Sequence, residues 1–268
     1  MNALSRWHPR TARGRLIGVT VVATVVGLAT AGTLILPARQ GHAVPSASSM
    51  ASSRCLSPVP SRRRAGGQGV LAVVGASFSA GVGAGSPGRA WPADLGRILH
   101  WRVEVSADPG AGYISRGAGH PGPFSALAAR LDLAALRPAV LLIQGGHNDV
   151  GQPLPRIDHT VRALLGQIRC QSPDTRIGIV TVFATGDRAS PATIRTDRAI
   201  VTAAQQVDPQ VMVFDPLTGH WQFPRVGDQL HPTPAGHRWI AARLAEGLRA
   251  HGVPGTARPS PSGTVPAA

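Results

Sequence analysis

The sequence predicts an α/β domain, a three-layer α/β/α sandwich in which helices cover both faces of a five-stranded parallel sheet. Five short, mostly apolar runs rich in β-branched residues alternate with five longer stretches of helical character. Such runs are typical of buried parallel strands, and strands that alternate with helices form a parallel sheet covered on both faces. The expected strands are residues 70–74, 103–105, 140–143, 177–182 and 211–214, and the expected helices are residues 91–100, 124–136, 155–170, 191–207 and 234–250.

Prolines mark the beginning of several predicted helices. Pro92 and Pro234 stand near two of these starts, where a missing backbone N–H removes no helical hydrogen bond. Functional sites in parallel sheets collect at the carboxyl ends of the strands. A motif that carries chemistry should therefore begin where a predicted strand ends.

The charge of the chain is distributed unevenly. The 268 residues carry a formal net charge of +14, yet all 13 acidic residues lie between Asp94 and Glu246. Residues 1–68 contain nine arginines and no acidic residue, so much of the excess charge belongs to the N-terminal segment. No basic helix and no basic stripe interleaved with aromatic residues occurs, and we therefore expect no nucleic-acid partner.

Residues 16–36 form an uncharged, mostly apolar run that is long enough to span a hydrocarbon core of about 30 Å. Four arginines precede it within residues 1–15, which predicts a cytoplasmic N-terminus and an extracytoplasmic remainder. The run is either a retained transmembrane anchor or a signal segment, because Gly41-His42-Ala43 fits a cleavage site. We expect a cell-envelope location, anchored or secreted.

Segments of low-complexity composition flank the predicted domain, which covers residues 69–252. Residues 37–68 are rich in serine, proline and arginine and predict a disordered tether, and residues 253–268 predict a disordered tail. The two cysteines, Cys55 and Cys170, either form one disulfide in an oxidising compartment or are two separate thiols. Their spacing fits no metal site, and we expect neither a metal nor a cofactor.

Four segments stand where a catalytic motif of this fold is expected. Three come after the ends of predicted strands, and the fourth lies just before the last predicted helix. They are Gly75–Ser79 (GASFS), Pro109–Tyr113 (PGAGY), Gly145–Asp149 (GGHND) and Asp228–Pro232 (DQLHP).

The first and last of these segments predict a serine nucleophile with its base. Ser77 lies on a tight turn at a strand end, which exposes its hydroxyl and offers its own N–H to a developing oxyanion. A serine hydroxyl requires a neighbouring base, for which His231 is the candidate. Asp228, three residues before His231, can reach back to the imidazole ring and fix its tautomer.

The two middle segments predict the remaining oxyanion donors. Asn148 carries an amide that can donate without competing as a nucleophile. Gly110 lets the backbone approach a substrate closely, and Gly112 is the alternative for the same N–H role. The predicted oxyanion hole therefore combines Ser77, Gly110 and Asn148. Tyr113 and His147 are the predicted substrate contacts, whereas His220 and His237 are expected to be wall or surface residues.

In this order the four segments resemble the conserved blocks of the SGNH hydrolase superfamily of GDSL-like esterases and lipases, over about residues 70–250. The resemblance implies a flavodoxin-like fold and ester hydrolysis without metal or cofactor, with Ser77 as nucleophile, His231 as base and Asp228 as its partner. One position departs from the pattern, because the aspartate of the first block is Ala76 here. In the family that aspartate braces the loop by hydrogen bonds, and Asp149 or a water is the expected substitute.

Two glycine-rich segments, Gly83–Gly88 and Gly117–Gly122, also match a dinucleotide-binding fingerprint. Both carry a proline where the phosphate-binding helix should begin, and neither follows a strand, so no nucleotide is expected.

The sequence thus predicts an exported, monomeric serine esterase. Its expected substrate is a short acyl or O-acetyl ester of a small molecule, glycan or lipid, because no long lipid-binding lid is evident. The same residues also serve an acyltransferase acting on a cell-envelope glycan or lipid. A catalytically weak envelope-binding module, to which Ala76 points, is the remaining alternative.

Overall fold

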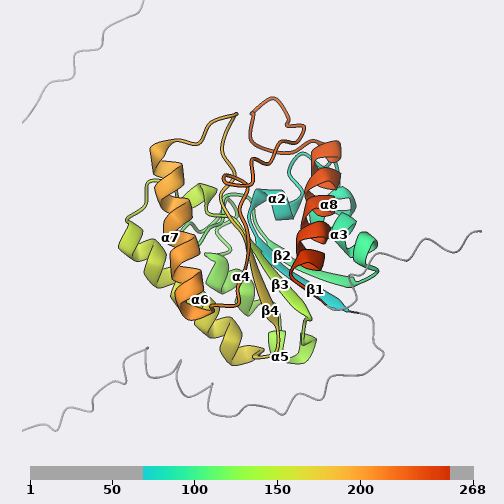
Figure 1. The fold of residues 1–268 in the computed structure, drawn as a ribbon, viewed down its shortest axis with the longest axis vertical. Helices are drawn as coiled ribbons and strands as arrows, with labels where there is room; N and C mark the ends of the chain where they lie inside the picture. Colours follow the sequence, from blue (N-terminus) through green and yellow to red (C-terminus); the bar gives the residue numbers. More distant parts are fainter. Residues whose placement is uncertain (1–68, 254–268) are drawn as a thin grey trace, which may run out of the picture. The chain divides into compact units, whose positions relative to one another are not determined.

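The computed structural model describes residues 69–253, which form the predicted three-layer α/β/α domain (Figure 1). All strands of the sheet are parallel, in the order β2-β1-β3-β4-β5. This is the flavodoxin-like order, in which the connections reverse direction between β1 and β3 and leave a crevice at the carboxyl ends of these two strands. The strands are β1 (Val70–Gly75), β2 (Arg102–Ala107), β3 (Val140–Gln144), β4 (Arg176–Val180) and β5 (Met212–Phe214).

Helices α3 (Trp91–Leu99) and α8 (Pro234–Ala250) cover one face of the sheet (Figure 1). The buried face of α8 repeats every fourth residue, with Ile240, Leu244 and Leu248 at most 1% exposed. This spacing places apolar side chains on one stripe of a helix. The helix begins where the sequence indicates, since Thr233 Oγ1 accepts a hydrogen bond from the Gly236 N–H at 3.2 Å.

Four helices cover the opposite face: α4 (Phe124–Ala129), α5 (Leu133–Leu136), α6 (Leu154–Gln171) and α7 (Pro191–Val207). Helix α6 buries an apolar stripe of which every residue is at most 1% exposed: Ile157, Val161, Leu164, Leu165 and Ile168. Ser190 caps α7 by accepting a hydrogen bond from the Thr193 N–H at 3.1 Å. The polar faces of these helices remain in solvent, as an amphipathic pattern requires.

Some element boundaries differ from the predicted ones. The single helix expected over residues 124–136 is two helices, because Asp132 leaves the helical conformation and its carboxylate accepts the Ala135 N–H at 3.0 Å. Strand β4 ends at Val180 rather than Val182. The short helices α2 (Ser77–Ala80), η1 (Pro87–Arg89) and η2 (His147–Asp149) were not expected, because single turns of helix carry little periodic signal.

The predictions for the two ends of the chain fall mostly outside the described residues. The basic N-terminus (1–15), the anchor or signal segment (16–36), the tether (37–68) and Cys55 all lie outside them, so the Cys55–Cys170 pairing stays a prediction. Within residues 69–253 no helix is long and apolar enough to cross a membrane. Val253, which the sequence assigned to the tail, is buried, and its N–H donates to the Leu248 carbonyl at 3.1 Å.

Leu165→Ala should destabilise the domain strongly. Its side chain is fully buried in the core under α6, and removal of a buried leucine side chain costs about 2–5 kcal/mol of unfolding free energy. Leu154→Ala on the same helix is the matched control, because Leu154 is 38% exposed and should change the unfolding free energy by less than about 0.5 kcal/mol. Urea unfolding of both variants tests the assignment of this buried face, and equal losses would contradict it.

Candidate active site

The nucleophile turn lies at the carboxyl end of β1. The strand ends at Gly75, and Ser77 is the first residue of helix α2, so its hydroxyl stands at the edge of the sheet. Only glycine fits at position 75, because an added Cβ would lie 2.1 Å from Ser79 Oγ. The first N–H groups of a helix have no intrahelical partner, which leaves the Ser77 N–H available to a ligand.

The base lies on a tight loop that precedes α8. The Asp228 carboxylate folds back on the loop, and its Oδ1 accepts the N–H groups of Leu230 and His231, both at 2.9 Å. Gln229 adopts φ +59°, a conformation that few non-glycine residues adopt. The loop closes through a hydrogen bond from the Val226 N–H to the His231 carbonyl at 2.8 Å. This network fixes the backbone from which the imidazole projects.

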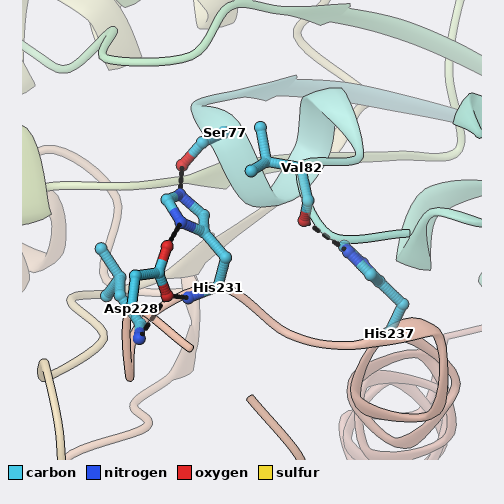
Figure 2. A network of polar contacts seen from close by, with 6 residues as sticks. Ser77, Val82, Asp228, His231 and His237 are labelled. Atoms are coloured by element: carbon cyan, nitrogen blue, oxygen red, sulfur yellow. Dashed lines mark hydrogen bonds and ion pairs between the residues drawn. The ribbon is translucent and has the colours of Figure 1, made fainter. Parts of the chain in front are cut away.

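Ser77, His231 and Asp228 form one chain of hydrogen bonds (Figure 2). His231 Nε2 lies 2.8 Å from Ser77 Oγ, and His231 Nδ1 lies 2.6 Å from Asp228 Oδ2. An ionised carboxylate can only accept, so Nδ1 carries the proton and Nε2 is free to accept the serine proton. The hydrogen bond from the His231 side chain, followed by the Leu230 N–H, lowers the pKa of Asp228 to about 2. The carboxylate therefore stays charged at neutral pH.

Aromatic side chains support the imidazole from the side. The Phe78 ring centroid lies 5.6 Å from that of His231, and Phe78 stacks on Phe183 at 4.4 Å. Phe223 contacts both phenylalanines edge-on. All three phenylalanines are at most 7% exposed, so this cluster is a packed wall next to the catalytic base.

The other two predicted oxyanion donors, Gly110 and Asn148, lie on segments that are joined to each other. Asn148 Nδ2 donates one hydrogen to the Ala111 carbonyl at 2.8 Å, and the second hydrogen of the same amide remains available. The Gly112 N–H is occupied by the Ser115 carbonyl at 3.0 Å, whereas within residues 69–253 no backbone carbonyl accepts the Gly110 N–H. Of the two glycines left open by the sequence, Gly110 therefore has the free donor.

Asp149 braces the loop that carries Gly110. Its carboxylate is fully buried and accepts three backbone N–H groups, from Tyr113 at 2.7 Å and from Ile114 and Ser115 at 3.0 Å each. The expectation that Asp149 substitutes for the missing acidic residue at position 76 is therefore wrong. The Asp149 carboxylate instead accepts its hydrogen bonds from the loop that carries Gly110.

The nucleophile turn is braced instead by Gln144, the last residue of β3. The Ser79 hydroxyl donates to Gln144 Oε1 at 2.8 Å, and the Ala76 N–H donates to the Gln144 carbonyl at 3.1 Å. Both side chains are at most 4% exposed. The sequence analysis did not identify this pair, although a polar residue directly after the apolar run of residues 140–143 is a signal that could have found it.

The structure places the two predicted substrate contacts differently. The Tyr113 ring is 3% exposed and packs on Phe124, with centroids 5.1 Å apart. Burial, followed by the nearby Asp149 charge, raises the pKa of its hydroxyl, so the phenol stays neutral. His147 is half-buried, and its Nδ1 donates to the Phe183 carbonyl at 3.1 Å. Substrate contact by either residue stays a prediction.

Comparisons with known proteins agree with this architecture. The model of the GDSL-like lipase/acylhydrolase family matches residues 73–239. The chain is 27% identical over 191 residues to the GDSL lipase Rv0518 of Mycobacterium tuberculosis, a match that covers 65% of this chain and 79% of that protein.

Two solved structures show the same fold. A family two carbohydrate esterase from Clostridium thermocellum, in complex with cellohexaose, superposes with a TM-score of 0.56 at 18% identity, covering 69% of this chain and 65% of that one. An acetyl xylan esterase from Butyrivibrio proteoclasticus superposes with a TM-score of 0.53 at 15% identity, covering 70% and 66%. This chain thus spans about two thirds of each of these two esterases.

Among residues 69–253, no group of histidine, cysteine, aspartate and glutamate side chains is arranged to hold a metal ion.

Ser79→Ala and Gln144→Leu should each slow the covalent labelling of Ser77 by a fluorophosphonate. Ser79→Ala leaves a buried amide oxygen without its donor, which costs about 1–3 kcal/mol of unfolding free energy. Because both changes remove the same hydrogen bond, the double variant should lose less than the sum of the single variants. Gln205→Leu, an exposed change on α7, is the control. Strictly additive losses in labelling rate would show that the pair does not act as a unit.

Proposed function

We propose that this chain, which belongs to the GDSL-like lipase/acylhydrolase family, is an exported serine esterase that removes short acyl groups, and in particular O-acetyl groups, from a glycan. The family makes it a carboxylic ester hydrolase. The observation that carries the catalytic assignment is the unbroken hydrogen-bond chain from Ser77 through His231 to Asp228.

In the first step His231 Nε2 takes the proton of Ser77 as Oγ attacks the ester carbonyl carbon. The carbonyl oxygen becomes an oxyanion, which the N–H groups of Ser77 and Gly110 and the amide of Asn148 stabilise. Asp228 stabilises the imidazolium that forms and keeps the ring in the orientation that its Nδ1–H bond defines. When the carbonyl re-forms, the alcohol leaves with the proton from His231 Nε2, and the acyl group stays on Ser77.

In the second step a water molecule takes the place of the alcohol. His231 Nε2 accepts one proton from this water as its oxygen attacks the acyl carbon, and the same donors hold the second oxyanion. Collapse returns the proton to Ser77 Oγ and releases the carboxylic acid. Apart from this water, the groups that act in the proposed cycle are side chains and backbone groups of this chain.

The preference for a short acyl group rests on the packing around the base. Phe78, Phe183, Trp221 and Phe223 are each at most 7% exposed, so they fill the space beside His231 rather than line a channel for a long chain. The glycan preference is suggested by the two similar folds, one an acetyl xylan esterase and the other a carbohydrate esterase crystallised with cellohexaose.

Export is supported by the N-terminal sequence. The uncharged apolar run over residues 16–36 follows four arginines, a charge asymmetry that keeps the N-terminus in the cytoplasm and directs the rest of the chain outward. The proposed location is the cell envelope, where the domain is either anchored by this run or released after it is cleaved. A glycan of the envelope is then within reach of the site.

Ser77→Ala should abolish both ester hydrolysis and fluorophosphonate labelling, because no other hydroxyl is hydrogen-bonded to His231 Nε2 within the described residues. Asn148→Ala should lower kcat on a chromogenic short-chain ester by roughly 10²–10³, the usual cost of one oxyanion donor, while the far-ultraviolet circular dichroism stays unchanged. Gln152→Ala, an exposed change just beyond η2 and outside the proposed donors, is the comparison variant. Full activity in Ser77→Ala would end the esterase assignment.

A panel of esters graded by acyl length, run beside an acetylated xylan, should show the highest kcat/KM for acetyl and a steady fall as the chain lengthens. Acetic acid release from the polysaccharide is the second readout. A preference for long acyl chains would contradict the proposed substrate class. Transfer of the acyl group to an added glycan acceptor in place of water would identify a transferase, and an unlabelled Ser77 in the wild type would identify a binding module.

A further inference from the structure

A second histidine, this one buried, connects the same two chain segments that the catalytic pair connects. His237 lies in the first turn of α8 and is fully buried, in contrast to the wall or surface position expected from the sequence. Its Nε2 lies 3.0 Å from the Val82 carbonyl oxygen, just beyond the helix that begins with Ser77 (Figure 2). Its Nδ1 accepts the Trp91 N–H at 3.2 Å, at the start of α3.

These two partners define the protonation state of His237. The Trp91 N–H can only donate, so Nδ1 is an acceptor and carries no proton. The Val82 carbonyl can only accept, so the proton is on Nε2. Burial is the main cause that lowers the pKa of His237, against the opposing effects of the Val82 hydrogen bond and of Asp94. The ring is thus neutral, with both nitrogens satisfied, as a buried polar group requires.

Val82 connects this histidine to the nucleophile. The Val82 N–H donates to the Ser77 carbonyl at 3.0 Å, and its own carbonyl accepts from His237. The next residue, Gly83, packs directly against the loop of the base, since a Cβ there would lie 2.2 Å from the Pro232 carbonyl oxygen. Residues 77–83 and 231–237 therefore meet at three points: Ser77 with His231, Val82 with His237, and Gly83 with Pro232.

We propose that His237 is a positioning residue for the hydrolysis: it ties the segment that carries Ser77 to the helix that follows His231, and so fixes the separation between nucleophile and base. This inference rests on the proposed esterase function. Ser77 and His231 are 154 residues apart in the chain and belong to two separate segments, the start of a short helix and a loop. The link through His237 joins both to α3 and α8, which pack on one face of the sheet.

The effect of losing this link follows from the geometry of proton transfer. The base must stay within hydrogen-bond reach of the serine oxygen, and a displacement of about 1 Å costs on the order of 10² in rate. Substrate binding depends less on this one distance. A positioning role therefore predicts a change in kcat with little change in KM.

Two substitutions distinguish the effect of the hydrogen bond between His237 and Val82 from the effect of burying a side chain at this position. In His237→Gln the side-chain amide offers one donor and one acceptor at about the separation of the two ring nitrogens, so both hydrogen bonds can re-form. In His237→Asn the shorter amide can still accept the Trp91 N–H but cannot reach the Val82 carbonyl. With a chromogenic short-chain ester we expect His237→Asn to lower kcat at least about tenfold, with KM within about threefold, and His237→Gln to keep kcat within about threefold of wild type.

Leu248→Ala is the control for stability, because Leu248 is fully buried on the same helix and has no hydrogen bond to the nucleophile segment through its side chain. It should lower the unfolding free energy while kcat stays near the wild-type value. Equal kcat in His237→Asn and wild type, or equal losses in His237→Asn and His237→Gln, would overturn the positioning role. If His237→Asn does not fold, His237→Gln is compared with Leu248→Ala at matched stability. A kcat of His237→Gln below that of Leu248→Ala would then also overturn the positioning role. A wild-type chain that neither cleaves esters nor labels at Ser77 refutes the esterase function itself, and this inference with it.

Discussion

The structure depends on one short contact, the 2.8 Å separation between Ser77 Oγ and His231 Nε2. Proton transfer tolerates little variation in such a distance, yet the two residues come from opposite ends of the domain. The parallel sheet brings the two residues together, because the carboxyl ends of all its strands lie at one edge. Ser77 follows β1 at that edge, and the loop of His231 returns to it just before α8. The remaining hydrogen bonds of the site hold these two loops in place.

Two segments of the site, the nucleophile turn and the Gly110 loop, each have a buried polar brace. Gln144 holds the nucleophile turn through Ser79 and the backbone of Ala76, and Asp149 holds the Gly110 loop through three N–H groups. Both braces lie at the end of β3 or just after it, at the centre of the sheet. A buried amide or carboxylate is costly unless all its partners are in place, so each brace favours one conformation of its loop. This division explains how the turn keeps its shape with alanine at position 76.

The aromatic wall and the buried His237 also hold Ser77 and His231 in position, and they do so from the other face of the sheet. Phe78 packs on the His231 ring, and His237 joins the segment behind Ser77 to α8. Packing and hydrogen bonding thus limit the freedom of both reacting groups before a substrate arrives. Preorganised geometry of this kind lets binding energy act on the transition state rather than on ordering the enzyme.

The sequence by itself determined the layered α/β fold, the GDSL-like family and the candidates Ser77, Asn148, Asp228 and His231, because periodicity and short motifs are local properties of the chain. It did not reveal the break at Asp132, where one side chain competes with the helix, or the roles of Gln144, Asp149 and His237. Those roles exist only between residues far apart in the chain. The tertiary structure decided them, since which buried donor meets which acceptor is fixed by packing of the sheet and helices.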